Sequence, residues 1–323
     1  MARKRQNDPL RYTANLIGLS VAAYLAATAL LRCGAGVLLR LFHEGATLAN
    51  PIAVPEWALG LVNLALPAAS AGASLWLMCA ALRGTPMRPR LSRRLPQDAR
   101  LWLFLPVFLG AGFLGNLLTA LLQKLLGACT RYTPPAALRL PQSNFALLLY
   151  FLGVCAVPAV LEELWLRGAV QTALSRWGAW FAILVSSVIF ALLHGDPAQM
   201  PALFFLSVFL GLAAHCTGVP AFGAALHLAN NTASFLFLYA SQRMDGISAL
   251  ALSGYLVAVF GLGAAGCAVL IGRSGVLRKF RPIPRVHDPK NRQSRFERIT
   301  CAPLFLGMML VLAARALWPL FAG

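Results

Sequence analysis

The chain is built from long apolar segments, each about as long as a helix that crosses a lipid bilayer. An α-helix rises 1.5 Å per residue, so roughly 20 residues cross about 30 Å of hydrocarbon. Of the 323 residues, 59% are apolar and only 12% are charged. The sequence therefore predicts an all-α, polytopic integral membrane protein with about nine transmembrane helices. We expect the spans at 12–33, 57–82, 101–123, 145–173, 179–195, 199–216, 219–240, 248–272 and 301–320.

Basic residues lie mainly in the short segments between these spans. The formal charge of +18 would suggest nucleic acid in a soluble protein, but here it indicates topology and contact with anionic lipid headgroups. Three basic clusters share one side if the N-terminus is cytoplasmic: Arg3 to Arg11, Arg83 to Arg100, and the nine Lys and Arg of 273–298. Lys124, Arg131 and Arg139 do not fit this one-sided distribution of basic residues. A single re-entrant segment would also change the predicted number of transmembrane helices. The basic N-terminal residues and the apolar run that follows them resemble a secretory signal peptide. The length of that run favours a first transmembrane helix that is not cleaved.

Three charged residues interrupt one of the apolar segments. Glu162, Glu163 and Arg167 fall within a hydrophobic run that begins at Phe145. A charge near the bilayer centre costs roughly 2.5–3.5 kcal/mol, so this group indicates a functional site. Residues four apart share a helical face, so Glu163 is expected to pair with Arg167 and brace the helix. Glu162 points elsewhere and, without that partner, is suited to act as a general base. Helix packing or an ion-conduction path is the alternative explanation.

Two further pairs of residues at a spacing of four follow in the next spans. Phe190 and His194 form one pair, and His227 and Asn231 form the other. If 174–178 and 217–218 are cytoplasmic turns, the helical rise places these groups at about the depth of Glu162. A single intramembrane histidine commonly bridges helices through hydrogen bonds. Two histidines and an asparagine in one layer with the glutamates instead favour a convergent polar site.

The ordered motifs E-E-x-x-x-R, F-x-x-x-H and H-x-x-x-N resemble the CPBP (Abi) family of intramembrane proteases. That family includes the type II CAAX prenyl endopeptidase and bacterial relatives linked to bacteriocin processing or immunity. The resemblance covers about 145–240 and includes the helix from Phe209 and Gly211 to Thr217-Gly218. Leu166 departs from the family, which commonly carries Phe before the Arg, and this puts only local packing in question.

The resemblance implies an endopeptidase of the glutamic type with no required cofactor. Glu162 and His194 would activate a water, while His227 and Asn231 would polarise the scissile carbonyl and stabilise the oxyanion. Glu163 and Arg167 would support this site, together with Phe190. The substrate would be a peptide or a membrane-protein segment, and the location a bacterial inner membrane.

Zinc is the minority alternative, with Glu162, His194 and His227 as ligands and water in the fourth position. The H-E-x-x-H motif is absent. Seven isolated cysteines without a C-x-x-C motif predict neither disulfides nor a metal knuckle.

Two non-proteolytic functions also fit an intramembrane polar cluster. A non-catalytic immunity factor or scaffold would keep the fold without needing all four polar residues. A proton-coupled transporter would show paired repeats or broken helices, which the sequence lacks. We expect three regions: an N-terminal three-helix region at 1–144, the catalytic core at 145–240, and C-terminal helices at 241–323 with the basic loop 273–298.

Overall fold

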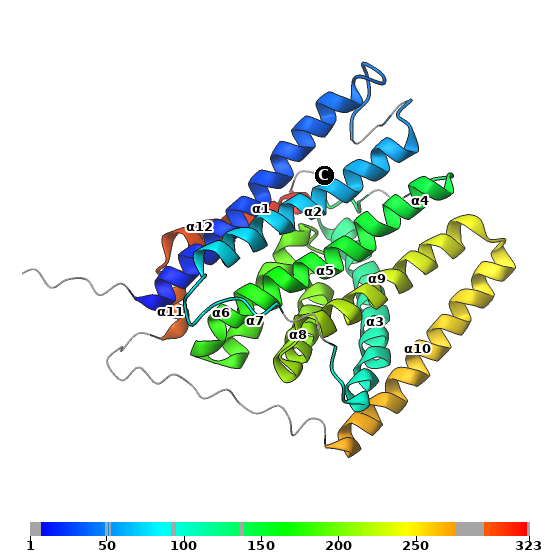
Figure 1. Ribbon diagram of the computed structural model, residues 1–323. Helices are drawn as coiled ribbons and strands as arrows, with labels where there is room; N and C mark the ends of the chain where they lie inside the picture. The colour runs from blue at the N-terminus through cyan, green and yellow to red at the C-terminus, as the bar shows by residue number, and fades with distance from the viewer. Residues whose placement is uncertain are drawn as a thin grey trace, which may run out of the picture.

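Helices form all of the regular secondary structure in the part of the chain that the structure describes (Figure 1). This computed structural model describes residues 8–48, 51, 53–91, 95–135, 139–275 and 294–321. The predicted all-α fold is confirmed. The long helices are α1 (Pro9–Leu39), α2 (Glu56–Ala81), α3 (Phe104–Cys129), α7 (Ala179–His194), α8 (Met200–Thr217), α9 (Pro220–Arg243), α10 (Gly246–Ser274) and α12 (Pro303–Leu317), together with one central helix described below. Two short helices precede α3 and α12: η1 (Ala99–Leu103) and α11 (Arg295–Thr300).

Each expected span coincides with a helix, although their ends differ by several residues. Within the described residues, seven helices are long and apolar enough to cross a membrane. Helix α7 is apolar but has only 16 residues, and α9 is not among the seven. The count of nine therefore stays a prediction. Much of the basic sequence used to predict topology falls in 1–7, 92–94 and 276–293, outside the described residues.

The central helix, Asn144–Trp177, is continuous but not regular. It comprises α4 (Asn144–Phe151), η2 (Leu152–Ala156), α5 (Val157–Glu163), η3 (Leu164–Gln171), α6 (Thr172–Leu174) and η4 (Ser175–Trp177). Segments η2 and η3 are π-helical. Such wider turns are rare and occur frequently at functional sites. They flank the short α5, whose last two residues are Glu162 and Glu163.

The wider turns leave backbone carbonyls available to other parts of the chain. The Gly168 carbonyl accepts a hydrogen bond from Arg90 N at 2.8 Å, which joins the α2–η1 link to η3. A Cβ at Gly168 would lie 2.9 Å from the Arg90 carbonyl oxygen, so this contact favours glycine. The π-helical geometry thus creates tertiary contacts that a regular α-helix would not offer.

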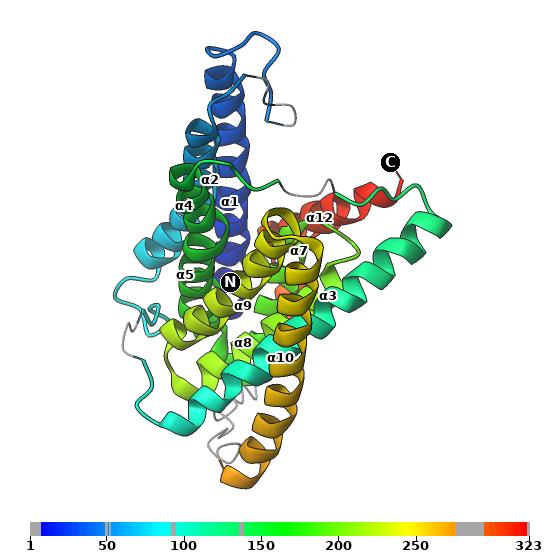
Figure 2. The same cartoon turned by 90° about the vertical axis from the view of Figure 1, so that its right-hand side faces the viewer.

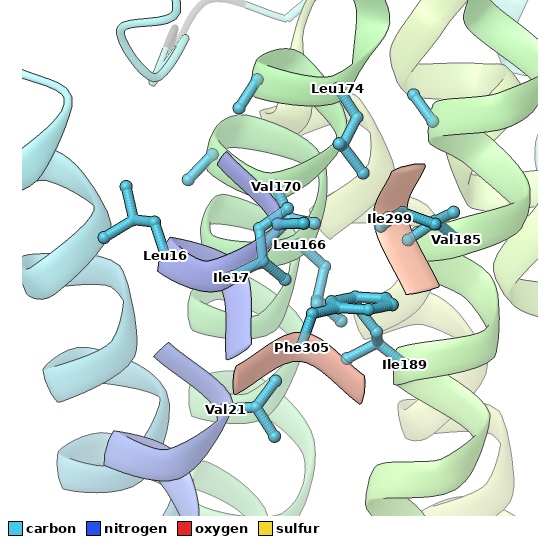
Figure 3. Close-up of a cluster of buried hydrophobic side chains, with 14 of the residues drawn as sticks. Leu16, Ile17, Val21, Leu166, Val170, Leu174, Val185, Ile189, Ile299 and Phe305 are labelled. Carbon is cyan, nitrogen blue, oxygen red and sulfur yellow. The ribbon is translucent and has the colours of Figure 1, made fainter. Parts of the chain in front are cut away.

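Apolar side chains on one face of the central helix pack against α1, α7, α11 and α12 (Figure 3). Leu166, Val170 and Leu174 recur every four residues and are fully buried. Leu166, the departure from the family pattern, thus fills an apolar cluster and lies beside Ile17 and Phe305 (Figure 3). Its effect is confined to packing.

A second apolar cluster lies on the opposite side of the molecule. There η1 and α3 pack against α8, α9 and α10, with Phe108 and Phe222 among the buried residues. Helices α1 and α2 pack against each other on one side of the central helix, whereas α3 and α10 pair on the other (Figures 1 and 2). The core that matches the family motifs is thus enclosed between the outer helices.

The last helix is held firmly against the first. A Cβ at Gly18 would lie 2.6 Å from the backbone of Leu304, so glycine permits α1 and α12 to approach closely. Arg298 donates to both carboxylate oxygens of Asp8, the N-cap of α1. Burial acts to raise the pKa of Asp8, but the hydrogen bond and charge of Arg298, together with backbone N–H donors such as that of Leu10, keep that pKa below its ordinary value. Helix α12 therefore has a defined position next to the core.

Candidate functional site

A closed polar cluster lies at the centre of the core, made of Glu163, Arg167, Ser207 and His227. Arg167 Nη1 donates to Glu163 Oε1 at 2.6 Å, the pairing that their spacing predicts. Arg167 Nη2 donates to Ser207 Oγ at 2.7 Å and to the Ser207 carbonyl at 3.2 Å. His227 Nδ1 lies 3.3 Å from Glu163 Oε1. Glu163 and Arg167 are fully buried, so each charge depends on the other for its stability.

Two side-chain hydrogen bonds, one helical turn apart, join the central helix to α8. Arg167 contacts Ser207, and four residues later Gln171 Nε2 donates to the Gly211 carbonyl at 2.9 Å. Both partners lie 40 residues away in sequence. Sequence reasoning missed Ser207 and Gln171. Their spacing from Gly211 and Arg167 was visible, but nothing local showed that the two helices would face each other.

Helix α9 supplies the other wall of the cluster. Gly223 and His227 are four residues apart and both approach Glu163. A Cβ at Gly223 would lie 2.7 Å from Glu163 Oε2, closer than a carbon can approach a carboxylate oxygen without displacement. Gly223 therefore allows the Glu163 side chain to fit between α5 and α9.

Phe190 contacts both the closed cluster and His194. Its ring lies under the guanidinium of Arg167, with Cζ 5.0 Å from the ring centroid. The same ring lies 4.8 Å from the His194 ring and 5.7 Å from the His227 ring, centroid to centroid. A cation over an aromatic face gains roughly 1–2 kcal/mol when desolvated. Phe190 thus contacts both the cluster and His194.

His194 is held with one ring nitrogen available. It is the last residue of α7, it is exposed, and its Nδ1 lies 2.9 Å from the Phe190 carbonyl oxygen. A carbonyl oxygen only accepts, so Nδ1 must carry the hydrogen. In the neutral imidazole, Nε2 then has a free lone pair and can accept a proton.

Glu162 is half-buried at the end of α5. No hydrogen bond or ion pair joins it to any residue within the described ranges. It is close enough to Arg167 and to the Tyr24 hydroxyl to interact with both electrostatically. Tyr24 of α1 stacks on Trp165 with ring centroids 5.3 Å apart. We call Glu162 and His194 the open pair, because neither is buried and neither forms an ion pair with a described residue.

Asn231 lies one helical turn beyond His227 on α9. Its Nδ2 donates to the Cys155 carbonyl at 3.3 Å, and Cys155 Sγ lies 3.5 Å from the Asn231 carbonyl oxygen. Cys155 belongs to π-helical segment η2, so this carbonyl is one that the wider turn makes available. The second N–H of the Asn231 amide remains free of any hydrogen bond within the described residues.

The structure thus brings together Glu163, Arg167, Phe190, His194 and His227 through direct contacts. No contact of this kind links Glu162 or Asn231 to the histidines in the described part of the chain. Across the same residues, no group of three or more His, Cys, Asp or Glu side chains is placed to hold a metal ion. The His227 nitrogen Nδ1 faces Glu163, and a zinc site made of Glu162, His194 and His227 stays an untested alternative.

Comparison with known families identifies the core. Residues 144–233 match the family described as type II CAAX prenyl endopeptidase Rce1-like. The match contains all seven residues singled out from the sequence, and it confirms the resemblance to the CPBP family. No curated protein and no solved structure gave a significant match.

Proposed function

We infer that the Rce1-like domain at residues 144–233 makes this protein an intramembrane endopeptidase of the CAAX protease type, with Glu162 and His194 as its catalytic pair. This proposal rests on the different environments of two adjacent glutamates in the family-matched core. Glu163 is fully buried and paired, whereas Glu162 and His194 form no ion pair with the described residues and keep exposed surface. A base that must meet water and substrate needs that exposure.

In the proposed reaction, a water placed between Glu162 and His194 attacks the scissile carbonyl carbon. The pair accepts the water proton, and a tetrahedral intermediate forms with negative charge on the former carbonyl oxygen. The C–N bond then breaks, and the proton passes to the departing amine. The products are one new carboxylate and one new amine.

His227 and Asn231 are the proposed donors to the oxyanion. Nδ1 of His227 faces Glu163, so only Nε2 is left to donate, and donation from both nitrogens requires the protonated ring. A hydrogen bond from Nε2 would stabilise the oxyanion in a low-dielectric site. The free amide hydrogen of Asn231 supplies a second donor.

The apolar helices and the membrane-protease domain indicate an integral membrane protein. We propose a bacterial inner membrane with the N-terminus in the cytoplasm, and basic segments that contact anionic headgroups. The proposed substrate is a peptide or a membrane-protein segment, and we propose no role for nucleic acid.

The decisive experiment compares the membrane proteome after exposure to the intact protein, to Glu162→Gln and to Glu44→Gln. Glu44 is exposed and far from the core in sequence, so it is the matched control. New N-termini should appear with the intact protein and with Glu44→Gln, and should be absent with Glu162→Gln. Equal cleavage by all three would eliminate Glu162 as the base. Absence of cleavage throughout would favour the non-catalytic scaffold.

Chelation distinguishes the metal-free mechanism from the zinc alternative. The proposed metal-free mechanism predicts that activity survives exhaustive dialysis against a chelator. Loss of cleavage that only added zinc restores would instead support the zinc enzyme.

A further inference from the structure

Arg315 is an unexplained charge in the last transmembrane helix, outside the family-matched domain. It lies in α12 among apolar residues, and its side chain is exposed. It makes no hydrogen bond or ion pair with any residue that the structure describes. A cation in an apolar span is costly and commonly marks a functional group.

The guanidinium of Arg315 lies directly beside the end of α7. A Cβ at Gly195 would meet Arg315 Nη2 at 3.2 Å, Nε at 3.3 Å and Cζ at 3.4 Å. Gly195 has φ +70° and ends the helix in the left-handed conformation. It also directly follows His194. The cation is therefore held one residue away from one member of the open pair.

Tyr24 places Arg315 and Glu162 on the same side of the core. Its hydroxyl interacts electrostatically with both of these side chains. No ion pair joins Arg315 to Glu162 among the described residues. Helix α12 contacts both α1 and α7, which fixes the position of the arginine.

Two ordinary explanations for Arg315 predict contacts that are missing here. An arginine that stabilises a helix C-terminus should donate to its last carbonyls, but none of the described α7 carbonyls accepts a bond from Arg315. An arginine that extends toward lipid headgroups should point away from the core. Its guanidinium instead covers Gly195.

We propose that Arg315 forms a carboxylate-binding subsite next to the open pair. A guanidinium binds a carboxylate through two parallel hydrogen bonds, which gives both affinity and orientation. The carboxylate would belong to the substrate chain, either at its C-terminus or on an acidic side chain. This subsite rests on the proposed function and extends it: α12 would position a substrate that the Rce1-like domain cleaves.

Binding without cleavage tests the subsite directly. The probe is three pools of N-acetylated apolar peptides: one with a C-terminal amide and no acid, one with a free C-terminus, and one amidated with a single Glu. Binding is measured as the shift in thermal unfolding midpoint of the full-length Glu162→Gln protein in neutral detergent. One or both acidic pools should bind, and the neutral pool should bind roughly 10- to 100-fold more weakly, as expected for a lost charged hydrogen bond.

Matched variants assign the effect to Arg315. Adding Arg315→Gln should remove the preference for acidic pools, and Arg315→Lys should keep part of it. Arg40→Gln is the control, since Arg40 is an exposed arginine at the end of α1. The difference between the two acidic pools shows whether the C-terminus or a side chain supplies the carboxylate.

Three results would overturn the subsite: equal binding of acidic and neutral pools, no binding of any pool, or an effect of Arg315→Gln that appears only with added phosphatidylglycerol. The last would identify a lipid headgroup as the ligand. Because the readout does not require catalysis, acid-selective binding by a protein that cleaves nothing would refute the proposed function and leave the subsite standing.

Discussion

The closed cluster and the open pair lie in the same family-matched core, and their charged groups have opposite environments. In the cluster, Glu163 and Arg167 are fully buried and neutralise each other. In the open pair, Glu162 is half-buried and His194 exposed, and neither has a charged partner among the described residues. Two adjacent glutamates thus occupy different environments. One environment suits a structural charge, and the other suits a group that must exchange protons with a bound water.

The largest expected effect is on the open pair. His194→Gln should reduce cleavage about 10²- to 10⁴-fold, the range for loss of a general base. Its unfolding midpoint in detergent should change little, because His194 is exposed and its one hydrogen bond is to a backbone carbonyl. Cleavage rate and unfolding midpoint are measured on the same preparation. A large loss of stability would mean that His194 belongs structurally to the cluster.

The next largest effect concerns the closed cluster, where we expect a substitution to reduce the stability of the protein as well as its cleavage rate. Arg167→Ala leaves Glu163 buried without a cation and should cost about 3–5 kcal/mol of stability as well as activity. The double variant Glu163→Leu with Arg167→Met removes both charges and should recover much of that stability, as measured by chemical unfolding in detergent. A stable, well-expressed but inactive Arg167→Ala protein would contradict the structural role.

The smallest expected effect tests how tightly α9 fits against Glu163. Gly223→Ala places a Cβ 2.7 Å from Glu163 Oε2 and should destabilise the protein by about 1–3 kcal/mol. Gly254→Ala is the matched control, since nothing lies within 4 Å of its Cβ position in α10. That change should be neutral or slightly stabilising, because alanine favours helix over glycine by up to about 1 kcal/mol. Equal unfolding midpoints for the two variants would show that the cluster tolerates displacement.

Several contacts in the site could be predicted from the spacing of residues along the sequence. Residues four apart share a helical face, so the Glu163–Arg167 pair and the Phe190–His194 contact followed from a regular helix. The π-helical turns did not, because no sequence pattern marks where a helix widens. Ser207 was also hidden, since a serine in an apolar helix gives no sign of which side chain it will meet.

Hydrophobic length and the cost of intramembrane charge are local properties, and by themselves they determined the helical membrane fold and the small set of candidate residues. Which of the two glutamates is buried depends on how α8 and α9 pack against the central helix. The placement of Arg315 depends likewise on the contact of α12 with α1 and α7. These contacts join residues that are distant in sequence. Only the packed structure therefore decided which of these charged side chains are buried and which keep exposed surface.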